Sequence, residues 1–293
     1  MAKLSVAVLG TGLMGAPMAA NILKAGYQVH AWNRTQEKAT PLIDLGAEVY
    51  SKACDAVRHA DLAIIMVTDG AAVADLLFEQ EVASSMKSGA IIVDMSSIRP
   101  AEAIDHSKRL AEMGIAHLDA PVSGGTRGAE AGTLAIMAGG AGKDFARAQG
   151  VLETMGRPVR VGETGAGQLA KLANQLIVGV TIGVVAEAML LAEQGGADPV
   201  ALRDALSGGF ADSIILQQHG ERMTSGNFEP GGLSSIQLKD LNNALLEAER
   251  CGIELPLAQQ ARERYARLCD PLGLGDKDHS ALYLELKERN NIG

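Results

Sequence analysis

Short apolar runs alternate with amphipathic stretches along the first half of the chain. Leu62–Val67 is continuously apolar, which is typical of a parallel strand covered on both faces. Strands that alternate with helices indicate βαβ units, and so a doubly wound parallel sheet of the α/β class. The pattern predicts strands at Leu4–Leu9, Tyr27–Trp32, Leu62–Val67, Ala90–Asp94, Ile115–Asp119, Thr133–Met137 and Val159–Val161, and helices at Met14–Lys24, Pro100–Glu112 and Phe145–Met155.

The pattern changes after Gly167. Gln168–Gln194 contains no proline and is dominated by Leu, Val, Ala and Ile, which predicts one helix about 40 Å long. Polar residues such as Lys171 and Glu187 interrupt it and leave too short an uncharged centre for a bilayer. We therefore expect a helix buried between domains or subunits, with Gly179 and Gly183 allowing close helix contact. Further helices are predicted at Pro199–Leu206, Ser213–Met223, Leu233–Arg250, Leu257–Leu268 and His279–Glu288.

These patterns divide the 293 residues into an α/β domain at 1–162 and an all-α domain at 163–293. The net charge of −9 argues against a general nucleic-acid binder, which needs a basic face. The three cysteines form no C-x-x-C pair, and this fits a reducing, cytoplasmic location. The six histidines show no metal-binding spacing, so no metal site is expected.

A glycine-rich motif directly follows the first predicted strand. Gly10, Gly12 and Gly15 form G-x-G-x-x-G between that strand and a helix. The first glycine permits a tight turn, the second lets backbone approach a pyrophosphate, and the third lets helix and strand pack closely. The helix N-terminus offers free N–H groups to phosphates. Because strand, motif and helix come in the required order, the sequence predicts a Rossmann-type dinucleotide-binding domain rather than an ordinary glycine-rich turn.

The end of the second strand indicates which dinucleotide is bound. An acidic residue there would bind the ribose hydroxyl of NAD and repel a 2′-phosphate. The chain has Asn33, Arg34 and Thr35 instead, which removes the repulsion and adds a cation and a hydroxyl. We therefore favour NADP(H) over NAD(H). The alternative is that Arg34 is an ordinary exposed loop residue.

A reductase that uses such a cofactor needs a proton donor beside the carbonyl. Lys171 is the leading candidate because it lies on the long apolar helix, with Asn174 and Gln175 at i+3 and i+4 on the same face. A lysine at the solvated end of that helix is the alternative.

Two further candidates remain open at this point. Ser123, Gly124 and Gly125 follow a strand and could cradle a carboxylate, or could form only a turn. Lys239, taken alone, is typical of a solvated surface lysine.

Five motifs together resemble the β-hydroxyacid dehydrogenases over essentially the whole chain. They are GTGLMG at 10–15, DMSS at 94–97, DAPVSGG at 119–125, GAGQLAKLANQ at 165–175 and KDL at 239–241. The resemblance implies a Rossmann domain joined by a long helix to an all-α domain, assembled as a homodimer or homotetramer. It also implies that Lys171 donates the proton during carbonyl reduction.

The remaining residue roles also follow from the resemblance. Ser123, Gly124 and Gly125 match the loop that binds the substrate carboxylate, with Asn174 in the amide-bearing segment and Gln175 where many members carry Asn. Ser96 and Lys239 match cofactor-contacting positions. The expected cofactor-binding set is Gly10, Thr11, Gly12, Leu13, Met14, Gly15, Asn33, Arg34, Thr35, Val67, Ser96 and Lys239.

The expected reaction is reduction of a small semialdehyde acid, such as tartronate semialdehyde, to its hydroxy acid. The alternatives are a 3-hydroxyisobutyrate-type dehydrogenase and a reductase of glyoxylate or succinic semialdehyde. Within the family, the chain most resembles the subgroup that reduces tartronate semialdehyde. Phe210 and Asp212 lie in a GGFADS loop that departs from that subgroup's usual GGLAGS, and Asp212 would repel an acidic substrate if it faced the pocket. A non-catalytic dinucleotide sensor is disfavoured because Lys171 and the Ser123–Gly125 loop are both retained. Neither nucleic acid nor a membrane is an expected partner.

Overall fold

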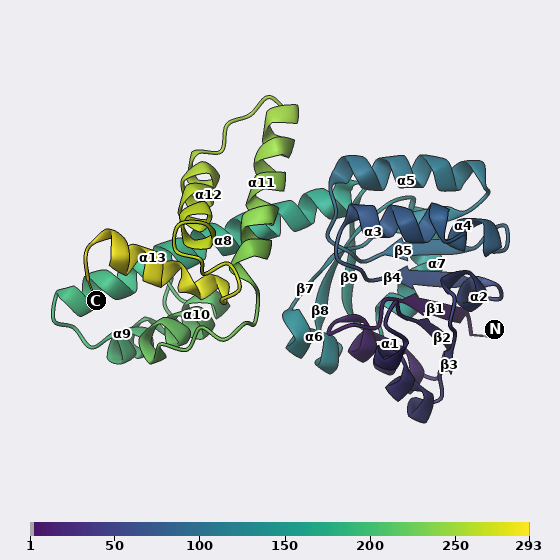
Figure 1. Cartoon of the computed structure of the whole chain (residues 1–293), viewed down its shortest axis with the longest axis horizontal. Coiled ribbons are helices and arrows are strands. Elements are labelled where there is room, and N and C mark those ends of the chain that lie inside the picture. The colour runs from purple at the N-terminus through teal and green to yellow at the C-terminus, as the bar shows by residue number, and fades with distance from the viewer. Residues whose placement is uncertain (1–2, 293) are drawn as a thin grey trace. The chain divides into compact units, whose positions relative to one another are not determined.

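The structure is a computed structural model that describes residues 3–292. The chain divides into two compact units, one ending at Lys171 and the other beginning at Leu172. The first unit contains a nine-stranded sheet and the second is helical (Figure 1).

The strands of the first unit are β1 (Ser5–Leu9), β2 (Gln28–Trp32), β3 (Glu48–Val49), β4 (Leu62–Ile65), β5 (Ile91–Asp94), β6 (Ala116–Asp119), β7 (Val122–Ser123), β8 (Leu134–Gly139) and β9 (Gly156–Gly162). Its α-helices are α1 (Gly15–Lys24), α2 (Ala53–Val57), α3 (Gly70–Ala74), α4 (Val82–Ser85), α5 (Pro100–Glu112), α6 (Gly125–Ala131) and α7 (Gly142–Leu152). Two 3-10 helices (Gln36–Lys38, Thr40–Leu45) and one π-helix (Asp75–Glu79) complete it.

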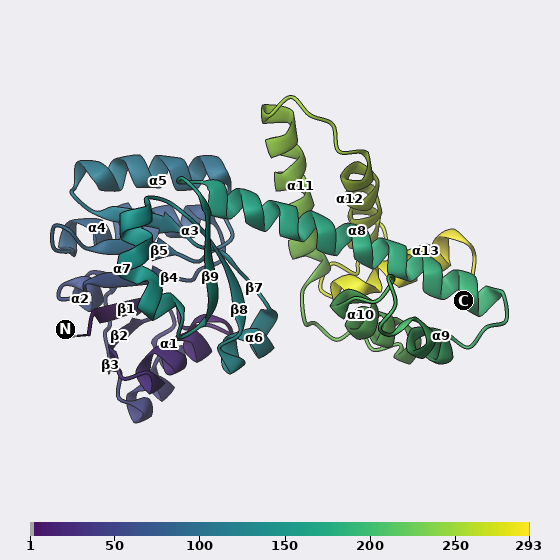
Figure 2. The same cartoon turned by 180° about the vertical axis from the view of Figure 1, so that it is seen from behind.

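Helices cover both faces of this sheet, so its central strands are apolar on both sides. Val6, Val8 and Ile64 belong to a core cluster that includes residues of α1, α6 and α7. Ala7 and Leu9 belong to a second cluster with residues of α2 to α5 on the opposite face. Figure 2 shows α1 and α7 on the near face of the sheet. The doubly wound α/β architecture predicted from the apolar runs is confirmed.

The parallel strands end in a row that positions the candidate site. Backbone register places Leu9 beside Trp32 on one side and Ile65 on the other, then Ile65 beside Asp94 and Asp94 beside Asp119. The strand order β3-β2-β1-β4-β5-β6 reverses direction at β1 and β4. Ligands of open α/β sheets bind outside the carboxyl ends of the strands at such a switch point. The residues after each of these strand ends are therefore gathered at one edge.

The sheet is not wholly parallel, which corrects the expectation from sequence. β8 runs antiparallel to both β6 and β7 and parallel to β9. Only α6 lies between β7 and β8, and its seven residues span about 10 Å. Because so short a helix cannot return the chain to the far edge of the sheet, β8 starts at the edge where β6 ended. The short helices α2, α3, α4 and α6 were also not predicted.

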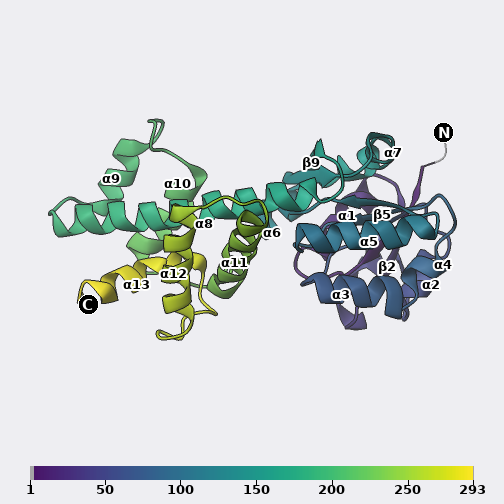
Figure 3. The same cartoon turned by 90° about the horizontal axis from the view of Figure 1, so that it is seen from above.

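The second unit consists of helices around the long helix α8 (Ala166–Gln194), whose first turns belong to the first unit. Its other helices are α9 (Pro199–Leu206), α10 (Ile214–Ser225), α11 (Ser234–Arg250), α12 (Pro256–Cys269), a 3-10 turn (His279–Ala281) and α13 (Leu282–Arg289). Figures 1 and 3 show the α9–α10 pair and the α11–α12 pair on opposite sides of α8. The predicted all-α character is confirmed, although the segment 279–288 begins as a 3-10 turn rather than as one helix.

Close packing of α8 explains one of its glycines. A Cβ added to Gly179 would lie 2.6 Å from Nε2 of Gln237 on α11, so a larger residue there would require the Gln237 side chain to move. The core of this unit includes Ile182, Met189 and Tyr265, all fully buried. By length and composition α8 could also cross a membrane, a test that the core helix of a water-soluble protein passes equally well.

Candidate active site

The glycine-rich turn leaves no room for side chains at two of its three glycines. Gly10 has φ +98°, and a Cβ there would lie 2.2 Å from the carbonyl oxygen of Met66. A Cβ on Gly15 would lie 1.8 Å from the carbonyl oxygen of Gly10. A Cβ on Gly12 would meet nothing within 4 Å. The turn is therefore packed against the sheet on one side and open above Gly12, where a pyrophosphate could approach the backbone.

Asn33 joins this turn to the end of β2. Its Oδ1 accepts a hydrogen bond from the backbone N–H of Thr11 at 2.9 Å, and its Nδ2 donates to the carbonyl of Thr35 at 2.9 Å. Asn33 thus links the glycine-rich turn to the segment after β2. It is also neutral, whereas an acid at this position would repel a 2′-phosphate. Oγ1 of Thr11 is buried, and among residues 3–292 no hydrogen-bond partner is found for it. A bound ligand at the turn would supply a hydrogen-bond partner for this hydroxyl.

The side chains beside the turn are open to solvent. Arg34 is exposed, and within the described chain its guanidinium makes no hydrogen bond or ion pair. Thr35 is exposed beside it, Met14 is partly buried, and Leu13 is 85% exposed. Arg34 is therefore available to an anion, and Leu13 offers an apolar surface next to the phosphate-binding backbone.

Val67 and Ser96 follow neighbouring strands and are directly connected. The backbone N–H of Val67 donates to Oγ of Ser96 at 3.1 Å, and the backbone N–H of Ser96 donates to Oδ1 of Asp94 at 2.9 Å. Asp94 and Ser96 are fully buried. Burial raises the pKa of the Asp94 carboxyl to about 7, although hydrogen bonds from Ser96 oppose the shift. The structure thus brings two predicted cofactor residues into direct contact, and Asp94 holds one of them, Ser96, in place.

Asp119, at the end of β6, caps the start of α8. Its Oδ1 accepts from the backbone N–H of Gly165 and its Oδ2 from that of Gln168, both at 2.8 Å. Burial raises the pKa of Asp119, and these backbone N–H groups act in the opposite direction. Because α8 carries Lys171 one turn later, Asp119 fixes the helix end on which the candidate proton donor stands.

Lys171 lies against the predicted substrate loop. Its Nζ donates to the carbonyl oxygen of Val122 at 2.9 Å, directly before Ser123. Gly124 and Gly125 follow with φ +137° and +61°, backbone conformations that side-chain-bearing residues rarely adopt. A cation, a hydroxyl and an open stretch of backbone are therefore gathered at one place, as binding a carboxylate and protonating a nearby carbonyl would require.

Asn174, Gln175 and Lys239 belong to the second unit, where a polar network joins α8 to α11. Nδ2 of Asn174 donates to Oε1 of Gln175 at 2.9 Å, and Nε2 of Gln175 donates to Oδ2 of Asp240 at 2.7 Å. Nζ of Lys239 lies 3.4 Å from Oδ1 of Asp240. Asp240 is buried, and it connects the amide pair predicted to contact substrate with the lysine predicted to contact cofactor.

Sequence reasoning missed Asp94, Asp119 and Asp240 as polar anchors. Each stands inside a quoted motif, so the residues were noted without a role. An acid at the end of an apolar strand was the available signal for the first two, because a buried carboxylate must find hydrogen bonds.

The loop between α9 and α10 holds the unusual Phe210 and Asp212. Oδ2 of Asp212 accepts from the backbone N–H of Gly208 and its Oδ1 from Nε2 of Gln217, both at 2.8 Å. The Gly208 N–H and the Gln217 amide hold the pKa of Asp212 below its usual range. Phe210 is fully exposed. The carboxylate of Asp212 is therefore committed to shaping its own loop.

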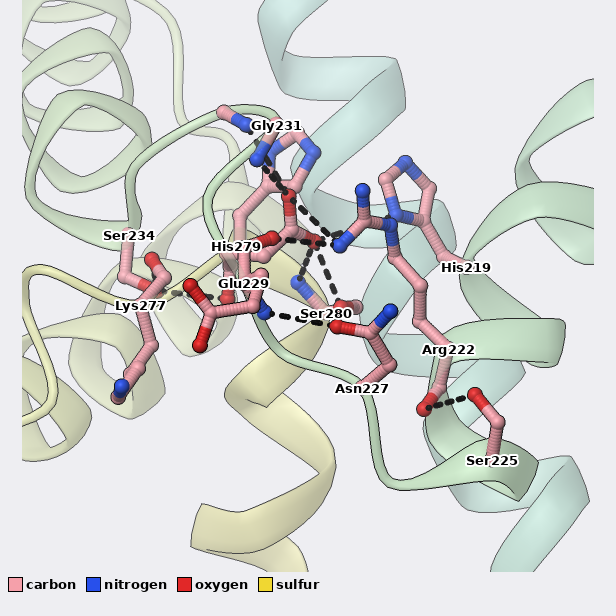
Figure 4. A network of polar contacts seen from close by, with 12 residues as sticks. His219, Arg222, Ser225, Asn227, Glu229, Gly231, Ser234, Lys277, His279 and Ser280 are labelled. Atoms are coloured by element: carbon pink, nitrogen blue, oxygen red, sulfur yellow. Dashed lines mark hydrogen bonds and ion pairs between the residues drawn. The ribbon is translucent and has the colours of Figure 1, made fainter.

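A second polar cluster lies in the helical unit, and Figure 4 shows His219, His279 and Ser280 among its residues. Ligand atoms of His219, Asp278 and His279 lie within 4.8 Å of one another, a grouping that could hold a metal ion by residue type. Asp278, however, already accepts backbone N–H bonds from Gly231, Gly232 and Ser280 at 3.0 Å each, and one from Oγ of Ser280 at 2.6 Å. Its oxygens are saturated, which makes it a structural anchor.

The titration of Asp278 reflects the same contacts. Burial by itself raises its pKa, but hydrogen bonds from His219 and Ser280 outweigh that effect and hold the pKa far below the usual range.

Comparison with known proteins covers both units. Residues 5–165 match the family profile described as the NAD binding domain of 6-phosphogluconate dehydrogenase. Residues 165–286 match the profile described as NAD-binding of NADP-dependent 3-hydroxyisobutyrate dehydrogenase.

Individual relatives match over nearly their whole length. The chain is 42% identical to 2-hydroxy-3-oxopropionate reductase of Escherichia coli over 95% of this chain and 96% of that protein. It is 34% identical to 3-hydroxyisobutyrate dehydrogenase of Pseudomonas aeruginosa over 89% and 91%. The structure of Mycobacterium tuberculosis 3-hydroxyisobutyrate dehydrogenase with L-serine matches with a TM-score of 0.88 and 31% identity, covering 97% of this chain and 99% of that chain. This chain therefore belongs to the β-hydroxyacid dehydrogenases, a family of nicotinamide-dependent oxidoreductases that includes 3-hydroxyisobutyrate dehydrogenase.

Proposed function

We propose that this enzyme reduces a small semialdehyde acid, of the size of tartronate semialdehyde, to its hydroxy acid. The observation that carries the proposal is the hydrogen bond from Nζ of Lys171 to the carbonyl of Val122, which holds the ammonium beside Ser123–Gly125. A molecule whose carboxylate is bound by that loop would present a neighbouring carbonyl carbon only a few bonds away. A short substrate therefore suits the arrangement.

The chemistry balances with one hydride and one proton. When bound, a reduced nicotinamide supplies the hydride to the aldehyde carbon, and the carbonyl π electrons move to oxygen. The ammonium of Lys171 donates a proton to that oxygen and becomes a neutral amine, which is reprotonated from solvent after the alcohol leaves. The Val122 carbonyl orients the ammonium, while Ser123 and the backbone of Gly124 and Gly125 hold the carboxylate.

We propose NADP(H) as the preferred cofactor. Arg34 is exposed and free to meet a 2′-phosphate, and Asn33 supplies no opposing negative charge. Two alternative reactions follow from the names of relatives: oxidation of 3-hydroxyisobutyrate, and reduction of glyoxylate or succinic semialdehyde.

The test is a panel of substrates. Tartronate semialdehyde, glyoxylate and succinic semialdehyde are each assayed for reduction with NADPH and with NADH, and 3-hydroxyisobutyrate is assayed for oxidation with NADP⁺ and with NAD⁺. The proposal expects the highest kcat/KM with a three-carbon semialdehyde acid and NADPH. A clear preference for 3-hydroxyisobutyrate or for a four-carbon substrate would replace it.

Lys171→Ala tests the assigned proton donor. The variant should lose kcat by about a thousandfold, within the contribution expected of a general acid, and should keep cofactor affinity within about threefold, because the lysine contacts the loop rather than the glycine-rich turn. Lys143→Ala, at an exposed lysine of the same unit, is the matched control and should behave as wild type. An unchanged kcat in the Lys171 variant would remove this residue from the mechanism.

A further inference from the structure

One buried amide connects the helix of Lys171 to the segment between β5 and α5. Oε1 of Gln168 accepts from the backbone N–H of Ile98 at 3.1 Å, and Nε2 of Gln168 donates to the carbonyl oxygen of Ser96 at 2.9 Å. The side chain is fully buried, and so is Ser96. Gln168 therefore satisfies one donor and one acceptor of a backbone segment that is far away in sequence.

Both ends of this connection lead to candidate site residues. Gln168 stands one helical turn before Lys171, and its own backbone N–H is held by Oδ2 of Asp119 at 2.8 Å. On the other side, Oγ of Ser96 accepts from the backbone N–H of Val67. The amide thus lies between the proton donor and the two residues expected to face the cofactor.

We propose that Gln168 is a positioning residue that fixes the Lys171 helix to the Ser96–Ile98 segment, so that proton donor and cofactor keep one relative geometry during turnover. This inference rests on the function proposed above. An amide suits the position because it presents a donor and an acceptor together, matching a carbonyl and an N–H two residues apart. Methionine offers neither group, and an ionised carboxylate offers only acceptors.

Loss of the amide leaves two buried backbone groups, the Ile98 N–H and the Ser96 carbonyl, without their hydrogen bonds. The contact between α8 and the Ser96–Ile98 segment should therefore become less rigid. A displacement of about 1 Å at a reacting group can cost about 100-fold in rate. Gln168→Met should therefore lower kcat by about 100-fold and raise the dissociation constant of NADPH by about fivefold, while Lys171 itself is unchanged.

Gln168→Glu provides a readout that a merely structural role would not move. When protonated, the new carboxyl donates to Ser96 and accepts from Ile98, as the amide does. When ionised, it repels the Ser96 carbonyl. Asp94 and Asp119 bond to the Ser96 and Gln168 backbone N–H groups, Glu102 of α5 acts electrostatically on Asp94, and Lys171 stands one helical turn after Gln168. All four are present in wild type as well, so normalisation to wild type at each pH separates their effects from those of the new carboxyl.

The experiment measures kcat, KM and NADPH binding by cofactor fluorescence for wild type, Gln168→Met and Gln168→Glu, at about pH 5.5 and about pH 8.5, where a buried carboxyl changes charge. The Gln168→Glu to wild-type ratio of kcat should rise at least about tenfold on acidification, and the Gln168→Met ratio should stay low and flat. Gln149→Met and Gln149→Glu, at an exposed glutamine of α7, are matched controls and should keep ratios near one.

The inference is overturned if Gln168→Met keeps kcat and NADPH affinity within about twofold of wild type, or if the Gln168→Glu ratio does not change with pH. Should the methionine variant not fold, the Gln168→Glu ratio decides. If wild type turns over none of the substrates, the proposed function fails. In that case the NADPH affinity of Gln168→Glu and its pH dependence still test whether the contact of Gln168 with the Ser96–Ile98 segment supports cofactor binding.

Discussion

At the scale of single residues, the site depends on buried polar groups that fix the residues around them. Asp94 holds Ser96, Asp119 holds the first turn of α8, and Asn33 holds the glycine-rich turn. Each carries out its role through backbone N–H groups, which are always present whatever the neighbouring side chains are. The candidate site residues are therefore positioned by residues that need not touch a substrate.

Asp94 should make stability depend on pH. Its folded pKa of about 7 lies above the ordinary value of 3.8, so between these two pH values the folded state holds a proton that the unfolded state has lost. Its contribution is complete below about pH 4 and is lost as pH rises through about 7, by up to about 4 kcal/mol. The asparagine of Asp94→Asn cannot titrate. In denaturant unfolding from pH 4 to 8, the free energy of unfolding of the variant should therefore increase relative to that of wild type as pH rises. Parallel curves would rule out a titrating Asp94.

Arg34 should decide between the two nicotinamide cofactors. Arg34→Ala removes the cation available to a 2′-phosphate, so KM for NADPH should rise about tenfold and KM for NADH less than about twofold. The control is Arg157→Ala, an exposed arginine on β9, which should change neither value. Equal effects on both cofactors would contradict the 2′-phosphate assignment. Steady-state kinetics with each cofactor at fixed substrate provides the measurement.

At the scale of elements, α8 and the loop before α11 are held by residues from elsewhere in the chain. The N-terminal N–H groups of α8 bond to Asp119, more than forty residues earlier in sequence. Asp278 bonds to the backbone of Gly231 and Gly232 in the same way and has His219 of α10 beside it (Figure 4). The start of α8 and the Gly231–Gly232 segment therefore gain these hydrogen bonds from tertiary structure rather than from local caps.

Asp278→Asn should destabilise the helical unit. Asparagine places an NH₂ group against N–H donors that the carboxylate accepted, so the free energy of unfolding should fall by about 3 kcal/mol or more. Hydrogen exchange should accelerate at the amides of Gly231, Gly232 and Ser280. The control is Asp276→Asn, an exposed acid in the same loop, which should leave exchange unchanged. Unchanged protection at those three amides would show that Asp278 is not an anchor.

At the scale of the whole molecule, the predicted site residues are distributed over two units of different structural class. The α/β unit holds the glycine-rich turn, Ser96, the Ser123–Gly125 loop and Lys171, and the helical unit holds Asn174, Gln175 and Lys239. The helical unit also exposes Ile177, Val184 and Leu191 of α8 at seven-residue intervals. Exposed apolar residues that recur along one helix face are typical of association.

We predict a homodimer or homotetramer, as the family resemblance implies. Light scattering on the full chain after size exclusion should give a mass of two or four chains. Val184→Glu places a charge in the middle of that exposed face and should shift the mass towards the monomer, whereas Leu13→Glu, at an exposed residue of the other unit, should not. A monomeric wild type would contradict the prediction.

Local patterns in the sequence determined the doubly wound class, the long helix, the helical second half and the glycine-rich turn. Each depends on residues close together in the chain: apolar runs of strand length, helical periodicity, and glycines at a turn where Gly10 and Gly15 admit no side chain. Lys171 also became the candidate proton donor in this way, since a lysine is unusual in an apolar helix.

Only the tertiary structure decided how those parts meet. The antiparallel return of β8 depends on the length of α6, and the bonds of Lys171 to Val122 and of Gln168 to Ser96 and Ile98 join segments 49 and more residues apart. The role of the buried acid Asp119 is likewise set by its tertiary contacts. Its hydrogen-bond donors, the backbone N–H groups of Gly165 and Gln168, come from more than forty residues further along the chain, so no local pattern predicts them.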